Sequence, residues 1–151
     1  MSFWRTKNGK KITSDSIVVD SDGTTLNNFL IKACSEDHSH SNSNITNTTT
    51  SAKTYGPTLN ITTTGKPLVV IASTVSYISA GNVDLFIKID NGWYSYATHS
   101  NSNRERTIGF KIIKNLAAGS HSITLGFACS QSGRTATIPA YASNSILAFE
   151  I

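Results

Sequence analysis

Three aromatic residues stand together near the middle of the sequence and are followed by a polar loop. Trp93, Tyr94 and Tyr96 come directly after an Asn-Gly dipeptide, and residues 98–106 are all polar. Aromatic rings can stack on the apolar faces of sugars, while Asn, His and Arg side chains can hydrogen-bond to sugar hydroxyl groups. Because loops on a rigid scaffold often hold binding residues, the pattern predicts a shallow carbohydrate site. The candidate ligand-binding residues are Tyr94, Tyr96, His99, Asn101, Asn103 and Arg104.

The same aromatic residues also have a structural interpretation. Successive side chains of a strand point to opposite faces, which separates Tyr94 and Tyr96 from Trp93. At least one of the two sets is therefore expected to pack in the core or between subunits. The sequence leaves open which set this is.

A second pattern, His38-Ser39-His40, has the spacing of a pair of metal ligands. In an extended chain the two imidazoles lie on one face. Three copies around a three-fold axis would supply six nitrogen ligands, which suits octahedral coordination of a transition-metal ion. The alternative is a pair of exposed histidines in a polar segment. We predict no cofactor that the protein requires.

The residues that could support catalysis do not form a hydrolase pattern. His121 stands between Ser120 and Ser122, but the sequence offers no third residue to orient it and no Gly-x-Ser-x-Gly motif. The acidic residues of the C-terminal part are scattered, without a pair spaced for glycoside hydrolysis, although folding could bring two of them together. We therefore predict that the protein is not an enzyme.

Residues 57–151 contain a series of short stretches in which apolar and polar residues alternate, which is the period of a β-strand. Turn-forming residues separate these stretches, and no helical pattern interrupts them. Among them, Asn91-Gly92 predicts a β-hairpin, because Asn-Gly accepts the positive φ angles of a tight turn. Regularly spaced short strands predict an all-β fold, an antiparallel β-sandwich, for which a jelly roll is the usual eight-stranded arrangement. The expected strands cover residues 58–62, 67–78, 83–90, 92–98, 106–114, 120–129, 134–138 and 145–151.

Alternation also selects the side chains expected in the core. The last strand runs to the final residue of the sequence, and we expect it to lie inside a sheet because an unpaired terminus frays. Its odd-numbered residues, from Leu147 onward, form its more apolar face. The predicted core consists of Leu85, Ile87, Phe110, Ile112, Ile123, Leu125, Phe127, Leu147 and Phe149.

The first third of the sequence differs in composition. Residues 1–34 are expected to form an attachment arm with a short helix over 24–34, where apolar residues follow helical spacing. Residues 35–56 are rich in Ser, Asn and Thr and too poor in apolar residues to order by themselves, which predicts a linker. The head is then residues 57–151. The apolar side of the helix needs a partner, either the same helix in other copies or the β-domain.

The composition narrows the class of protein. The chain has 151 residues, of which 15% are charged, and a formal net charge of +4. A low content of charge with much Asn, Ser and Thr is typical of extracellular or virion β-proteins. The basic residues near the start are too sparse to predict nucleic-acid binding. Neither a secretion signal nor a stretch long enough to insert in a membrane is present, and two cysteines do not make a disulfide framework.

Three segments of the C-terminal third resemble the tip domains of bacteriophage tail fibres and baseplates. They are Lys-Asn-Leu-Ala-Ala-Gly-Ser-His-Ser-Ile-Thr-Leu-Gly-Phe at 114–127, Ala-Thr-Ile-Pro-Ala at 136–140 and Leu-Ala-Phe-Glu-Ile at 147–151. In that family a loop ending in Ala-Gly-Ser/Thr-His leads into a core strand, and a Leu-x-Val/Phe-x-Glu strand closes the chain. The resemblance covers part of the chain and implies a homotrimeric jelly roll akin to the tumour-necrosis-factor-like fold.

The resemblance also implies a function. The protein would lie on the virion surface, attach to other virion proteins through residues 1–34, and recognise a bacterial cell-surface polysaccharide with its trimeric, non-enzymatic head. It favours the metal interpretation of His38 and His40, because such pairs bind metal in trimeric fibres. Two alternatives stay open. One is a structural protein that decorates a capsid or baseplate without a ligand, and the other is an enzyme that degrades wall polysaccharide.

Overall fold

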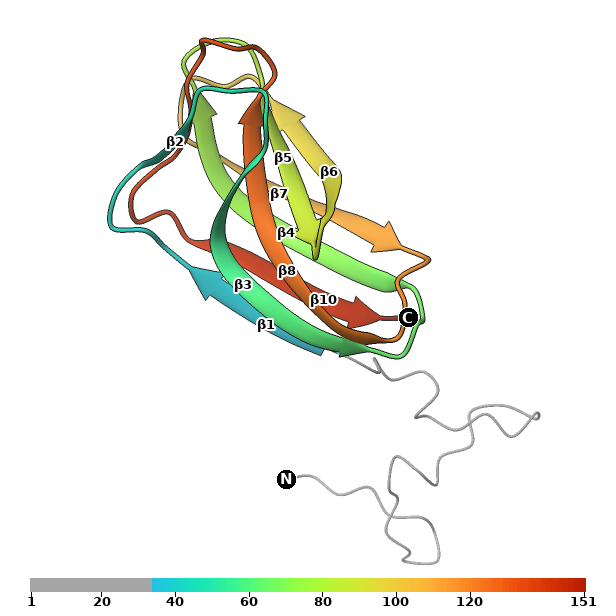
Figure 1. The fold of residues 1–151 in the computed structure, drawn as a ribbon. Coiled ribbons are helices and arrows are strands. Elements are labelled where there is room, and N and C mark those ends of the chain that lie inside the picture. Colours follow the sequence, from blue (N-terminus) through green and yellow to red (C-terminus); the bar gives the residue numbers. More distant parts are fainter. Residues whose placement is uncertain (1–33) are drawn as a thin grey trace, which may run out of the picture. The chain divides into compact units, whose positions relative to one another are not determined.

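The computed structural model describes residues 34–151, and every regular element in this range is a β-strand (Figure 1). The predicted arm and its helix over 24–34 lie outside the described residues, except for Cys34. None of residues 34–151 forms a helix long and apolar enough to cross a membrane. The strands are β1 (Cys34–Ser39), β2 (Ile45–Asn47), β3 (Lys53–Thr63), β4 (Leu68–Ile78), β5 (Val83–Ile89), β6 (Gly92–His99), β7 (Glu105–Ile113), β8 (Gly119–Cys129), β9 (Ala136–Ile138) and β10 (Asn144–Glu150).

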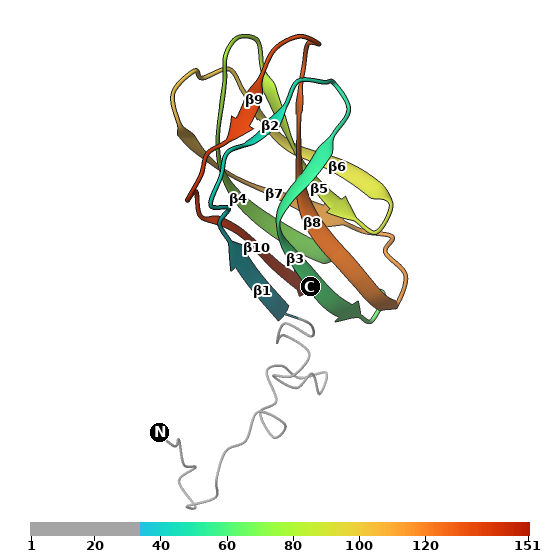
Figure 2. The ribbon, with the colours of Figure 1, turned by 60° about the vertical axis from the view of Figure 1, so that its left-hand side comes forward.

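The strands form two antiparallel sheets that pack face to face (Figures 1 and 2). One sheet has four strands in the order β3-β8-β5-β6, and the other has six in the order β1-β10-β4-β9-β2, with β7 also paired to β4. The prediction of an all-β antiparallel sandwich is confirmed, and the arrangement is consistent with a jelly roll. The last strand, β10, lies between β1 and β4, inside its sheet as expected.

The hairpin predicted near residue 91 joins β5 to β6. Its two turn residues are Asp90 and Asn91, because Ile89 pairs with Gly92 across the hairpin. Asp90 has a φ of 50°, a left-handed conformation that the short side chain of Asp tolerates well. The two turn residues are therefore Asp90 and Asn91, and not Asn91 and Gly92 as in an Asn-Gly turn.

The segment 35–56 does not form the linker expected from its composition. Strand β1 pairs with β10, β2 pairs with β9, and β3 begins at Lys53 and pairs with β8. Polar edge strands can join a sheet because the ladder uses backbone groups, whatever the side chains. Asn47 adds a buried anchor, since its side-chain amide donates hydrogen bonds of 2.9 Å to the carbonyl oxygens of Ser51 and Phe127. The head thus begins at β1 rather than at residue 57.

The core lies between the two sheets and contains five of the predicted residues, all buried: Leu85, Ile87, Ile123, Leu125 and Phe127. The other four predictions are wrong. Phe110 and Ile112 are exposed, and Leu147 and Phe149 are only half-buried. Strands β7 and β10 turn the opposite set of side chains inward, so that Ile113, Ile146, Ala148 and Glu150 are buried instead. Strand β10 has apolar residues on both faces and so gives no signal of which face meets the core. Strand β7 has one strongly apolar face, and it points away from the core.

Candidate ligand-binding site

Tyr96 is a structural residue, not a ligand-binding one. Its hydroxyl donates a 3.0 Å hydrogen bond to Oγ1 of Thr74, which also bonds to the hydroxyl of Tyr55 inside the sandwich. Its ring lies against Gly109 of β7, where an added Cβ would come within 2.7 Å of Cδ2 of Tyr96. Burial raises the pKa of Tyr55 and of Tyr96, so both phenols stay neutral. The structural interpretation of the aromatic pair holds for Tyr96.

His99 is also held inside the fold. Its Nε2 lies 2.7 Å from Oγ of Ser76, and its Nδ1 is 3.4 Å from the backbone nitrogen of Asn101 and 3.7 Å from Oε2 of Glu105. Burial lowers the pKa of His99 and outweighs the opposite effect of the nearby Glu105 carboxylate. A neutral imidazole that donates from Nε2 and accepts at Nδ1 satisfies these contacts.

The structure reveals a cluster that resembles a hydrolase triad and that the sequence did not predict. A serine, Ser76, contacts a histidine, His99, which lies near a carboxylate, Glu105. Two observations argue against catalysis by this cluster. The side chain of Ser76 is fully buried, and the 3.7 Å separation of His99 and Glu105 is too long for a hydrogen bond. The cluster therefore offers no accessible nucleophile and ties β4 to the end of β6.

The remaining loop candidates are exposed but do not join Tyr94. Asn101 accepts a 2.9 Å hydrogen bond from the backbone N–H of Asn103 and so shapes the loop, while Arg104 is exposed. Tyr94 and His99 are five residues apart on β6, which corresponds to about 16 Å along a strand. The six predicted ligand-binding residues therefore do not line one site.

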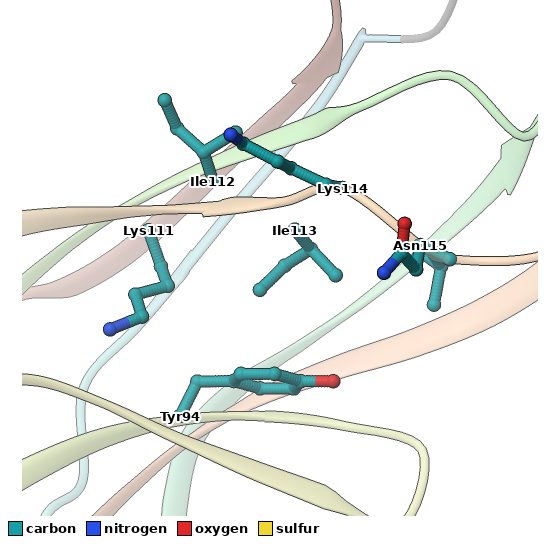
Figure 3. Close-up of a pocket in the computed structure, with 7 residues that line it drawn as sticks. Tyr94, Lys111, Ile112, Ile113, Lys114 and Asn115 are labelled. Atoms are coloured by element: carbon teal, nitrogen blue, oxygen red, sulfur yellow. The ribbon is translucent and has the colours of Figure 1, made fainter.

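Tyr94 instead lines a shallow cleft at the open edge of the sandwich, between β6 of one sheet and β7 of the other (Figure 3). The cleft has a volume of about 370 Å³, within the range of small-molecule sites. The residues that line it are Tyr94, Lys111, Ile112, Ile113, Lys114, Asn115 and Leu116. Only Tyr94 was predicted from the sequence.

The cleft combines an aromatic ring with polar and positively charged groups. In Figure 3 the ring of Tyr94 lies opposite Ile113, with Lys111 and Asn115 to either side. Among the described residues, no carboxylate lies within 4.0 Å of the ammonium group of Lys111 or Lys114. The cleft can therefore offer a stacking surface, an amide and unneutralised positive charge to a single ligand.

Trp93 lies on the opposite face of β6, outside the four-stranded sheet, and is 39% exposed. Its ring covers Gly126 of β8, where an added Cβ would lie 2.2 Å from Cζ3 of Trp93. Phe86 meets the ring edge-on, at 6.0 Å between centroids, and the ammonium of Lys88 is 5.6 Å from the ring centroid. Trp93 thus fills the space that a glycine leaves in a neighbouring strand.

The structure places the two histidines of the metal hypothesis at one edge of the sandwich. His38 belongs to β1, and its backbone pairs with Ser145. His40 follows β1, is exposed, and has its ring 6.4 Å from that of Tyr141. Residues 34–151 contain no group of three or more His, Cys, Asp or Glu side chains that could hold a metal ion. Coordination by copies around a three-fold axis remains a prediction.

His121 forms an ion pair that the sequence did not predict. Its Nδ1 lies 2.8 Å from Oδ2 of Asp90, and its Nε2 lies 2.9 Å from the carbonyl oxygen of Ala117. These hydrogen bonds, the one to Asp90 first, raise the pKa of His121, and the bond from His121 is the main cause of the lowered pKa of Asp90. The pair joins the β5–β6 turn to β8.

The pair predicts a pH dependence of stability. The contribution of His121 is complete below the ordinary imidazole pKa of about 6.5 and is lost as the pH rises through its raised folded pKa. That of Asp90 is lost only as the pH falls through its lowered pKa. Because Asp90 is partly exposed, we expect its ion pair with His121 to add about 0.5 kcal/mol to the free energy of unfolding. Chemical denaturation should show a lower free energy of unfolding for His121→Gln than for wild type at pH 5.5, and this difference should shrink by pH 8.5.

Comparing the two proteins at each pH cancels the contribution of His99. The lowered pKa of His99 acts in the opposite direction, because its stabilisation is lost as the pH falls below about 6.5. A difference between wild type and His121→Gln that stays constant from pH 5.5 to 8.5 would contradict the prediction.

Comparison with known proteins reveals distant structural likeness but no sequence family. No protein-family model and no curated protein matches the sequence. A solved structure of the infectious bursal disease virus VP2 subviral particle is similar, with 9% sequence identity and a TM-score of 0.38. The match covers 80% of this chain and 38% of the VP2 chain, so the chain spans well under half the length of that protein. A likeness of this degree carries no functional argument.

Proposed function

We propose that the protein is a non-enzymatic virion head that binds a bacterial surface glycan through the cleft of Tyr94. The observation that carries the proposal is the solvent-open cleft itself, in which an aromatic ring lies beside Asn115 and the ammonium group of Lys111. The resemblance of residues 114–151 to phage tip domains supports the virion setting. It also supports attachment through residues 1–34 and a location on the virion surface.

The chemistry of the cleft suits a saccharide. A tyrosine ring can stack on the apolar face of a pyranose, and an amide can both donate to and accept from hydroxyl groups. The ammonium group of Lys111 would favour sugars that carry a carboxylate or phosphate group. One such cleft is shallow, and we expect a dissociation constant near 1 mM, about −4 kcal/mol. Several heads on one particle would raise the avidity without further contacts.

A glycan array of bacterial surface polysaccharides tests the proposal, followed by titration of the best ligand by NMR. Lys111→Gln should weaken binding by about tenfold, and Asn115→Ala by a similar factor. Lys66→Gln is a matched control, because Lys66 is exposed outside the cleft and the charge change is the same. Resonances of Tyr94 and Leu116 should shift on binding.

Three results would contradict the proposal. If a bound glycan shifts resonances of the 98–106 loop and leaves the cleft unchanged, the site is the one first expected from the sequence. If no glycan binds but the protein assembles into particles, the structural alternative without a ligand is correct. Release of reducing ends from wall extract would instead indicate an enzyme.

A further inference from the structure

We propose that the outer face of the six-stranded sheet is an interface with a second copy of this chain. The outer face is the side of β4, β7 and β10 that points away from the four-stranded sheet. Ile108, Phe110 and Ile112 of β7 are 66%, 63% and 42% exposed on it. Such exposure is unusual for three large apolar side chains on one strand. The apolar residues of the outer face are Val69, Ile71, Val75, Ile108, Phe110, Ile112, Leu147 and Phe149.

The strand register aligns these side chains in rows across the sheet. Phe149, Val69 and Ile112 are cross-strand neighbours on β10, β4 and β7. Leu147, Ile71 and Phe110 form the next row. Directly opposed residues of neighbouring strands lie about 5 Å apart, so that the rows merge into one apolar surface. This continuity separates the outer face from apolar residues scattered singly on a surface.

Two of these strands have the sequence of strands that are covered on both sides. On β4, Val70 is buried in the core and Ile71 lies on the outer face; on β10, Ile146 and Leu147 repeat the arrangement. Near-continuous apolar runs are typical of strands buried on both faces. The four-stranded sheet covers one side of β4 and β10. Within residues 34–151, no element covers the other side.

The charged residues of the outer face lie at its margins. Arg106 donates a 2.9 Å hydrogen bond to Oγ of Ser73. Lys114 directly follows β7 and points away from Tyr94 in Figure 3, and Glu36 of β1 pairs with Leu147. The cores of protein interfaces are depleted of charge in the same way. Two copies that each carry a net charge of +4 can therefore meet here without burying like charges. An acidic or basic partner would find no complementary group in the centre of the face.

The size of the outer face suits a contact between copies. Three strands of about seven residues each cover roughly 14 Å by 23 Å. This footprint of roughly 320 Å² is the apolar centre of a contact, and the polar margins around it would supply the rest of the roughly 600 Å² per partner of the smaller specific interfaces. A closed ring or pair of identical subunits hides identical apolar faces from water without any other component. The same contact would build the trimer predicted from the sequence.

The test is the mass of the full chain in solution, measured by light scattering after size exclusion at micromolar concentration. We expect two or more times the 16.2 kDa of one chain. Phe110→Asp places a charge at the centre of the outer face and should raise the dissociation constant on the order of 100-fold, leaving a monomer. Tyr141→Asp is the control, since Tyr141 is 72% exposed and lies in the loop between β9 and β10, outside the three strands of the face. The mass of this variant should equal that of wild type.

A monomeric wild type would overturn the proposal and would indicate that residues 1–33 or a different protein cover the face. An unchanged mass for Phe110→Asp would also overturn it. Circular dichroism should show the same β-sheet signal for Phe110→Asp as for wild type, because the side chain is exposed. If that variant unfolds, hydrogen exchange of wild type decides: protection of β7 amides should rise with protein concentration, and constant protection would refute the contact.

Discussion

Phe127→Ala is expected to lower the free energy of unfolding by about 3–5 kcal/mol, a large fraction of the roughly 5–15 kcal/mol that is typical of a folded domain. Phe127 is fully buried in β8 and meets the ring of Tyr55 edge-on at 5.2 Å between centroids. Removing the ring leaves a cavity between the two sheets, and rigid paired strands cannot close it. Denaturation in urea, followed by tryptophan fluorescence, measures the loss.

The control for Phe127→Ala removes an aromatic ring from the surface. Tyr141→Ala should change the free energy of unfolding by less than about 0.5 kcal/mol, because the ring is largely exposed. If Phe127→Ala costs no more than Tyr141→Ala, the two sheets do not pack around Phe127 as the structure shows.

Glu150→Ala is expected to lower the free energy of unfolding by about 3 kcal/mol. Glu150 is buried, yet no cation of the described residues lies within 4.0 Å of its carboxylate. Its Oε1 accepts hydrogen bonds from the backbone N–H groups of Thr64, at 2.7 Å, and Lys66, at 3.2 Å. Its Oε2 accepts a 3.0 Å bond from the hydroxyl of Thr64. Alanine would leave the two backbone donors of this turn without a protein acceptor.

Glu150→Gln separates the hydrogen bonds from the charge. The amide oxygen of Gln can still accept from both backbone N–H groups, and its nitrogen can donate to the hydroxyl of Thr64. We expect this variant to lose less than half as much stability as Glu150→Ala in the same denaturation experiment. Equal losses would mean that the negative charge, and not the hydrogen bonding, stabilises the β3–β4 turn.

Local sequence patterns predicted the strands well. Alternation located all of the long strands, and the turn near residue 91 placed the β5–β6 hairpin, because strand period and turn chemistry depend only on neighbouring residues. The short strands β1 and β2 were missed. Their pairing with β10 and β9 is made by backbone groups of distant segments, and no apolar pattern in residues 35–56 records it.

The sequence by itself determined that the protein is an antiparallel β-sandwich and that Leu85, Ile123 and Phe127 lie in its core, since each stands on the one apolar face of its strand. Only the tertiary structure decided the faces of β7 and β10. Strand β10 has apolar residues on both faces, and the one strongly apolar face of β7 points away from the second sheet, which alternation alone does not indicate. The tertiary structure likewise moved the candidate site from the 98–106 loop to the cleft of Tyr94. Lys111 and Asn115 reach that cleft from a strand and a turn of the other sheet, a proximity that arises only when two sheets meet.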